Sequence, residues 1–426
     1  MIKKILKGLG RLAALSVILT SLYLVNLFFM KPYSIDHYLG KELVFGLMDS
    51  PEAMTYIGVF DRFNWLTKHN SKLSIPQEDD IEKDIIDLEK SIKTLYKYDD
   101  SKLSDNQRIT KKIAIFDLEN SLKELKEFPY LDYPLNQIGG IHLNTVEFMS
   151  GMHPIRNKSE AEDYIKRVNL IKEVYEGVLK DLEKQAINEI YPPEFVYGHV
   201  IKQLNEFINY SYDDHPLYSQ FMMKVDKLEL SDEDINNLDQ EIKKAINESV
   251  TPGFKLLLGF MKKTQKNANK NHGIWSQPGG DEYYKLRIRT YTTTDFSPEE
   301  IHQMGLSEVE RISNRMREIL TSLGYDTAKS VGEIMNDLNE NPDFLYADTP
   351  DRKEIVVNDY MKMVDEAIEV MTEYFHTMPK SEVIVKAVPE YSEQTAAGGY
   401  YQAPALDGSR PCLLYTSDAA DDVECV

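Results

Sequence analysis

Apolar residues recur every three or four positions along most of the chain, which is the spacing of amphipathic helices. The clearest stripe consists of Leu306, Val309, Ile312, Met316, Ile319 and Leu323. Just before it, Ser297 offers a capping hydroxyl, Pro298 suits the first helical position, and Glu300 completes a capping box. The pattern therefore predicts a helix that begins after Ser297.

The same spacing predicts helices on both sides of this stripe. The expected helices cover residues 81–98, 105–128, 160–190, 194–208 and 359–376, with two more in 231–262 that are separated at Thr251-Pro252-Gly253. Ser104 and Gln107 form a second capping box. Shorter helical segments are expected within 51–69 and within 135–150, where Gly139-Gly140 interrupts the pattern.

Two segments have the composition of strands. Residues 283–294 are mostly aromatic, β-branched or long and charged, and alternate residues from Tyr284 to Thr290 share one side, so we expect an extended segment. Residues 383–388 are β-branched and lie between Pro379 and Pro389. The sequence therefore predicts a mainly α fold with a minor β-sheet. Because it contains no fixed-period repeat or low-complexity linker, we expect residues 31–411 to form one domain.

The N-terminus has the pattern of a membrane anchor. Lys3, Lys4, Lys7 and Arg11 precede an uncharged apolar run from Leu12 to Met30, about 28 Å long as a helix, which is enough to cross a bilayer. The basic flank places the N-terminus in the cytoplasm. We therefore expect residues 1–30 to be an uncleaved signal anchor, with one transmembrane helix and the body on the extracytoplasmic side. A cleaved secretory signal is the alternative, because it shares the basic start and apolar centre.

Charge and cysteine content exclude two classes of site. The net charge of −21 is spread along helical stretches, which argues against a nucleic-acid partner. The two cysteines, Cys412 and Cys425, both lie within the last fifteen residues. Neither a disulfide framework nor a cysteine metal site is therefore available before them.

Histidines could supply metal ligands or substrate-binding groups. No two of the nine are three or four residues apart, so the helical zinc pair is missing from this sequence, and there is neither a G-x-S-x-G motif nor a P-loop. His302 extends the apolar stripe near the start of its helix. A lone histidine on such a face is usually packed and hydrogen-bonded, so we expect a core residue. The alternative is a substrate-binding group.

Residues 391–411 combine glycines and prolines with polar side chains that could line a cleft. Tyr400, Tyr401, Ser409 and Arg410 are the candidate substrate-binding residues, together with His302. A guanidinium can bind a carboxylate through two hydrogen bonds, and a phenol can donate to a developing oxyanion. The alternative is a surface loop rich in turn residues.

Several motifs together resemble the bacterial domain-of-unknown-function family 885 (DUF885), whose members resemble helical, zincin-type zinc metallopeptidases. The matching motifs are His215-Pro216-Leu217-Tyr218, Pro278-Gly279-Gly280 with Tyr283-Tyr284, Thr292-Thr293-Thr294 with the stretch from Pro298 to Leu306, and Tyr400-Tyr401 with Asp407-Gly408-Ser409-Arg410-Pro411. They cover roughly residues 45–411. The resemblance implies a large helical zincin-like domain.

In that family the Ser-Arg-Pro segment continues into a strand and then into a His-Glu-x-x-Pro-Gly-His segment, which supplies the zinc ligands and the glutamate base. The continuation is missing here. Residues 412–426 instead read CLLYTSDAADDVECV and resemble a translated sequencing adapter, so we expect a non-native tail. We therefore assign no catalytic residue and no metal ligand in this chain, and expect the domain to be incomplete at its C-terminal end.

These observations lead to one expected function and one alternative. The resemblance implies the N-terminal part of an exported, membrane-anchored, zinc-dependent peptidase-like hydrolase. The intact protein would bind zinc and a peptide substrate, whereas this chain would bind no zinc and be inactive. The alternative is a membrane-tethered helical binding or scaffold module without catalysis. The downstream reading frame would distinguish the two.

Overall fold

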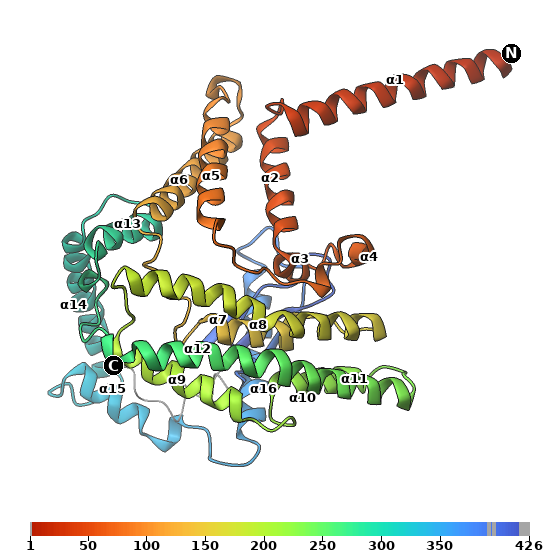
Figure 1. Cartoon of the computed structure of the whole chain (residues 1–426). Helices are drawn as coiled ribbons and strands as arrows, with labels where there is room; N and C mark the ends of the chain where they lie inside the picture. The colour runs from red at the N-terminus through yellow and green to blue at the C-terminus, as the bar shows by residue number, and fades with distance from the viewer. Residues whose placement is uncertain (1, 390–392, 394–397, 417–426) are drawn as a thin grey trace.

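The computed structural model describes residues 2–389, 393 and 398–416, and shows a mainly helical protein with a small sheet (Figure 1). This confirms the predicted class. The helices are α1 (Ile2–Phe29), α2 (Ile35–Asp49), α3 (Pro51–Ile57), α4 (Asn64–Thr67), α5 (Asp80–Tyr96), α6 (Asp105–Glu127), α7 (Ile141–Glu147), α8 (Lys158–Ile187), α9 (Glu194–Asn209), α10 (Pro216–Val225), α11 (Asp232–Ala245), α12 (Thr251–Thr264), α13 (Gly280–Thr292), α14 (Pro298–Ser322), α15 (Val331–Asn339) and α16 (Arg352–Met371).

The main hydrophobic core surrounds α8, which packs against α11 and α12; α9 packs on α12 (Figure 1). Tyr164 of α8 stacks on Phe221 of α10 with ring centroids 4.9 Å apart. Gly253 lets α12 approach α8 closely, because a Cβ at this position would lie 2.9 Å from the Tyr175 ring. The predicted helices at 160–190, 194–208 and 231–262 thus form the centre of the fold.

The last two of these helices are not separated as expected. α11 continues through a π-helical turn, η5 (Ile246–Val250), directly into α12. Pro252 lies in the first turn of α12, directly after the π-helical turn that interrupts the regular α-helical hydrogen bonding. The proline therefore marks a helix start without a loop.

The sheet has the order β1-β3-β2, formed by β1 (Val383–Ala387), β2 (Gly399–Gln402) and β3 (Cys412–Thr416). β3 runs parallel to β1 and antiparallel to β2, and α16 packs against β1. The strand predicted at 383–388 is confirmed. The first five residues of the expected non-native tail form the central strand, while 417–426 lie outside the described residues.

The strand predicted at 283–294 is wrong, because α13 covers this segment. Gly280, Tyr283 and Leu286 are its buried residues, and their spacing of three places them on one helical face. Lys285 also pairs with Glu282 one turn earlier. Strand propensity is a weak preference, and packing on a helical face overrides it here.

The N-terminal segment forms the single long helix α1, which projects from the body (Figure 1). Its end is fixed by Asn26, whose side chain donates to the Lys31 carbonyl at 3.0 Å and accepts from the Tyr33 amide at 3.0 Å. Among the helices of the described residues, none is both long and apolar enough to cross a membrane. The structure therefore gives no support to the transmembrane helix predicted for residues 12–30.

Candidate functional site

Polar side chains gather where the sheet meets the helical body. The Gln402 side chain donates from Nε2 to Glu147 Oε1 at 2.5 Å, and the Tyr400 hydroxyl also hydrogen-bonds this carboxylate. The Tyr400 ring stacks on Tyr415 of β3, with centroids 4.7 Å apart. We call Glu147, Tyr400, Gln402 and Tyr415 the sheet-face cluster.

Glu147 is the carboxylate of this cluster and the last residue of α7. Partial burial raises the pKa of Glu147, while the hydrogen bonds from Tyr400 and Gln402 act in the opposite direction. The side-chain oxygen of Gln402, Oε1, is buried and has no hydrogen-bond partner in the protein. A half-buried carboxyl and a free amide oxygen thus lie side by side.

A π-helical turn, η4 (Phe148–Met152), follows Glu147 and positions a cation. Lys224 of α10 donates to the carbonyls of Ser150 at 2.7 Å and His153 at 3.1 Å. Burial lowers the pKa of Lys224 to about 8, and the positive charges of Lys386 and Lys227 act in the same direction. Lys224 therefore fixes the turn that directly follows Glu147.

The predicted site residues are close together in sequence but fall into different environments. Tyr400 belongs to the sheet-face cluster. Tyr401 lies on the other face of β2 with 59% of its surface exposed, and its hydroxyl lies 3.6 Å from Cys412 Sγ. Ser409 donates its amide to Asp407 Oδ1 at 3.0 Å in an exposed turn. Only Tyr400 therefore joins the cluster directly.

Arg410 holds the segment between β2 and β3 against α3. Its Nη2 donates to the carbonyls of Tyr56 at 2.9 Å and Ala403 at 3.2 Å, and its guanidinium lies 4.7 Å from the centroid of the Tyr56 ring. The neighbouring turn packs equally closely, because a Cβ at Gly58 would lie 2.7 Å from Asp407 Oδ1. Arg410 thus anchors the loop, and its bonds go to backbone carbonyls.

His302 lies on α14 and is exposed, so the expectation that it packs in the core is wrong. The helix itself begins as predicted: Ser297 accepts from the Glu300 amide at 3.2 Å, and the Glu300 carboxylate accepts from the Ser297 amide at 2.8 Å. However, Leu320 is the one buried residue within α14. Spacing correctly predicted the helix, but none of the described elements covers its stripe.

The comparison with known proteins decides the family. The sequence matches the family described as "Bacterial protein of unknown function (DUF885)" over residues 51–424. The chain belongs to this family. The predicted resemblance is therefore confirmed, and nothing among the curated proteins matches the chain.

Two solved structures are similar to this DUF885 chain. One is described as a putative lipoprotein from Colwellia psychrerythraea, with 26% identity and a TM-score of 0.76, and the alignment covers 87% of this chain and 66% of that one. The other, a putative lipoprotein of unknown function from Shewanella oneidensis, shares the fold at 16% identity and a TM-score of 0.56, covering 92% and 66%. The DUF885 chain therefore spans just under two thirds of each relative.

The zincin resemblance implies zinc, so we asked whether the residues of this DUF885 chain fit a metal. His153 bonds Arg167 through Nδ1 and the Glu160 carbonyl through Nε2, and His69 bonds Thr67 and Asp61. Among the described residues, no three or more His, Cys, Asp or Glu side chains form a group that could hold a metal ion. The described residues do not fit a zinc site.

Arg167 is the centre of a buried polar network that the sequence did not predict. It is fully buried, and its guanidinium donates to Lys72 O at 2.8 Å, Thr55 Oγ1 at 2.7 Å and His69 O at 2.8 Å. Burial lowers the pKa of Arg167 to about 10. Because these acceptors lie on or beside α3 and the short helix η2 (His69–Ser71), the network fixes the N-terminal segment to α8.

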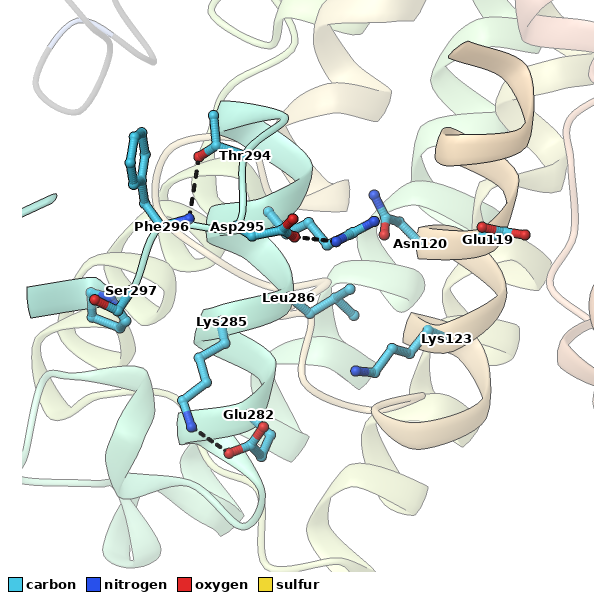
Figure 2. Close-up of a pocket in the computed structure, with 12 residues that line it drawn as sticks. Glu119, Asn120, Lys123, Glu282, Lys285, Leu286, Thr294, Asp295, Phe296 and Ser297 are labelled. Carbon is cyan, nitrogen blue, oxygen red and sulfur yellow. Dashed lines mark hydrogen bonds and ion pairs between the residues drawn. The ribbon is translucent and has the colours of Figure 1, made fainter. Parts of the chain in front are cut away.

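A separate cavity of about 540 Å³ lies between α6, α13 and the start of α14 (Figure 2). Lys285 donates to Glu282 at 2.6 Å, and Arg289 pairs with Asp295 (Figure 2). The Asn120 side-chain nitrogen is buried without a partner. Since these opposite charges pair with each other, the cavity offers no excess charge to select an ion, and the sheet-face cluster is the stronger candidate site.

Proposed function

We propose that this DUF885 chain forms the peptide-binding part of an exported, membrane-attached, peptidase-like hydrolase. The observation that carries the proposal is the Glu147 carboxyl, whose pKa is raised and which bonds Tyr400 and Gln402 of β2. In the order β1-β3-β2, β2 is an edge strand of the described sheet. An extended peptide could add to such an edge through main-chain hydrogen bonds.

The side chains around this edge suit a peptide. Glu147 can accept a peptide N–H or a terminal ammonium, and Tyr400 can donate to a carbonyl. The unpartnered Gln402 Oε1 offers a further acceptor. Tyr401 and Ser409 would flank the peptide, while Arg410 would hold the loop in place. His302, on the exposed face of α14, receives no part in this arrangement.

The zinc site that the resemblance implies would lie in the third of the relatives' length that this chain does not span. We assign the zinc ligands and the glutamate base to that part, because the described residues do not fit a metal. The chain alone would then bind peptides without cleaving them.

Membrane attachment is proposed from the basic, apolar N-terminal segment together with the relatives described as putative lipoproteins. The test is protease treatment of intact spheroplasts that express the chain, followed by fractionation. We expect the body to be degraded and a short N-terminal fragment to stay with the membrane. A body that is protected inside the cell would contradict the proposal.

Peptide binding is tested by fluorescence anisotropy with a labelled random decapeptide mixture. We expect Glu147→Gln and Tyr400→Phe each to weaken binding about tenfold or more, because each removes a polar group that would contact the peptide. Tyr374→Phe is the matched control, since Tyr374 is 77% exposed and lies in the turn after α16, and should change binding less than twofold. Peptide binding that is unchanged in both variants would show that the peptide does not contact Glu147 or Tyr400, and would contradict the proposal.

A further inference from the structure

α14 presents an uncovered apolar seam. Leu306, Val309 and Ile312 are 52%, 63% and 47% exposed. The apolar residues from Val309 to Leu323 follow alternating steps of three and four, which is the spacing of a seam that packs along another helix. A continuous exposed seam of this length is unusual on a free protein surface and marks an interaction site.

The charged residues of α14 leave this seam clear. Arg311 donates to Glu308 at 2.7 Å and Arg315 to Glu318 at 2.8 Å, so these charges pair along the helix itself. A partner for the seam therefore needs apolar side chains at helical spacing and no excess charge. This requirement excludes nucleic acid and favours an amphipathic helix.

α16 also exposes apolar side chains. Its exposed apolar residues include Ile355, Met363, Ile368 and Val370, whereas Arg352 and Val356 are the buried ones. Two of the long helices that follow the main core are therefore amphipathic, and the described part of the chain buries little of their apolar surface. The core itself ends with α12.

The comparison with the Colwellia lipoprotein indicates what covers the seam. The structural alignment covers 87% of the present chain at a TM-score of 0.76. About one third of the Colwellia lipoprotein, however, has no counterpart in the present chain. Exposed apolar helices of the shared part are a surface suited to receive this additional third. We propose that the α14 seam, with the exposed apolar residues of α16, docks helices from the third of the DUF885 fold that has no counterpart in this chain.

The first test uses the solved Colwellia structure. The positions that align with Leu306, Val309 and Ile312 should be apolar, and residues from the unmatched third should bury them. If these positions are exposed there, or are buried only by a second copy of the chain, the proposal is overturned. This test does not depend on whether the unmatched third binds zinc, so failure of the proposed function leaves it standing.

The second test compares the same substitutions in two proteins. Val309→Glu combined with Ile312→Glu should shift the melting temperature of the present chain by less than about 2 °C, because both positions are exposed. The same pair at the aligned positions of the Colwellia lipoprotein should lower its melting temperature by more than about 5 °C, because it would bury two unpaired carboxylates.

Two further variants serve as controls, in case the double variant of the Colwellia lipoprotein fails to fold. Alanine at the position aligned with Val309 should lower the relative's melting temperature measurably and leave that of the present chain unchanged. Glu310→Lys, on the polar side of α14, should shift neither protein by more than about 2 °C. Equal small shifts in both proteins, or dimerisation of the present chain that the double substitution abolishes, would overturn the proposal.

Discussion

His142 is a residue whose protonation the fold opposes. It is fully buried, bonds Gln203 Oε1 through Nε2 at 2.9 Å, and leaves Nδ1 without a partner. Burial lowers the pKa of His142 to about 4 from its ordinary value of 6.5. Between pH 6.5 and 4, His142 is therefore protonated in the unfolded chain but mostly neutral in the folded chain.

We therefore predict that His142 makes the protein less stable in acid. Its contribution is complete above pH 6.5 and is lost as the pH falls toward 4, at about 1.4 kcal/mol per pH unit over that interval. Between pH 7.5 and 4.5 the wild-type chain should lose roughly 2–3 kcal/mol more than a His142→Gln variant. Urea unfolding of both proteins at several pH values measures the difference.

The comparison with the variant is needed because other groups titrate in the same direction. Burial also lowers the pKa of His215 to about 4, and desolvation with the charge of Arg167 lowers that of His153. Both histidines remain in the His142→Gln variant, so their effects cancel in the difference. Parallel pH profiles for the two proteins would show that His142 does not titrate on unfolding in this interval.

At the same scale, part of the candidate site was predictable. Tyr400 was found because aromatic polar residues in a loop of glycines and prolines are suited to line a cleft. Glu147 was missed, because only a strand from far along the chain brings Tyr400 and Gln402 to it. Such long-range proximity leaves no signal in a single sequence. The contacts of Arg410 with backbone carbonyls were not predictable from its residue type.

Among the elements, those with local start signals were predicted best. The capping boxes at Ser104 and Ser297 both formed as expected, since a cap involves residues only three positions apart. α13 was mistaken for a strand, because aromatic and β-branched residues reflect only a weak preference and its buried face depends on α6. Whether other elements cover the apolar stripe of α14 likewise depends on tertiary packing, which the local sequence does not determine.

The two capping boxes allow a matched prediction. Ser297→Ala and Ser104→Ala each remove a cap that stabilises a helix by about 1 kcal/mol. α6 packs against α5 and α13, whereas α14 buries only one residue. Ser104→Ala should therefore lower the melting temperature, while Ser297→Ala should leave it unchanged and speed amide hydrogen exchange in the first turn of α14.

Hydrogen exchange by mass spectrometry, alongside thermal unfolding, distinguishes the two effects. The exchange of the central helix α8 serves as an internal control and should not change in either variant. A fall in melting temperature of similar size for both variants would mean that α14 is coupled to the core. That result would also weaken the inference that the α14 seam is a docking surface for additional helices.

For the molecule as a whole, the helices divide by how much of their apolar surface they bury. α8 to α12 form a continuous core, whereas α14 and α16 leave apolar faces exposed. This division matches the comparison with the solved relatives, which are about half as long again as the shared part. The main core of the described residues is thus formed by elements up to α12, and the apolar faces left exposed belong to helices that follow it.

The last prediction concerns zinc. A catalytic zinc site needs about three protein ligands with one position left for water. The buried histidines 69 and 153 use both ring nitrogens in hydrogen bonds within the frame, so recruiting them would break the network around Arg167. We therefore predict that the present chain shows no one-to-one zinc binding in calorimetric titrations at pH 7.5.

The Colwellia lipoprotein, which includes the additional third, is the comparator. Under the same conditions we expect it to bind one zinc ion, and its activity on a peptide mixture should disappear with a chelator and return with zinc. The present chain should show neither effect. Tight stoichiometric zinc binding by the present chain would place the ligands among its own nine histidines or its carboxylates, and would overturn the assignment of the metal to the additional third.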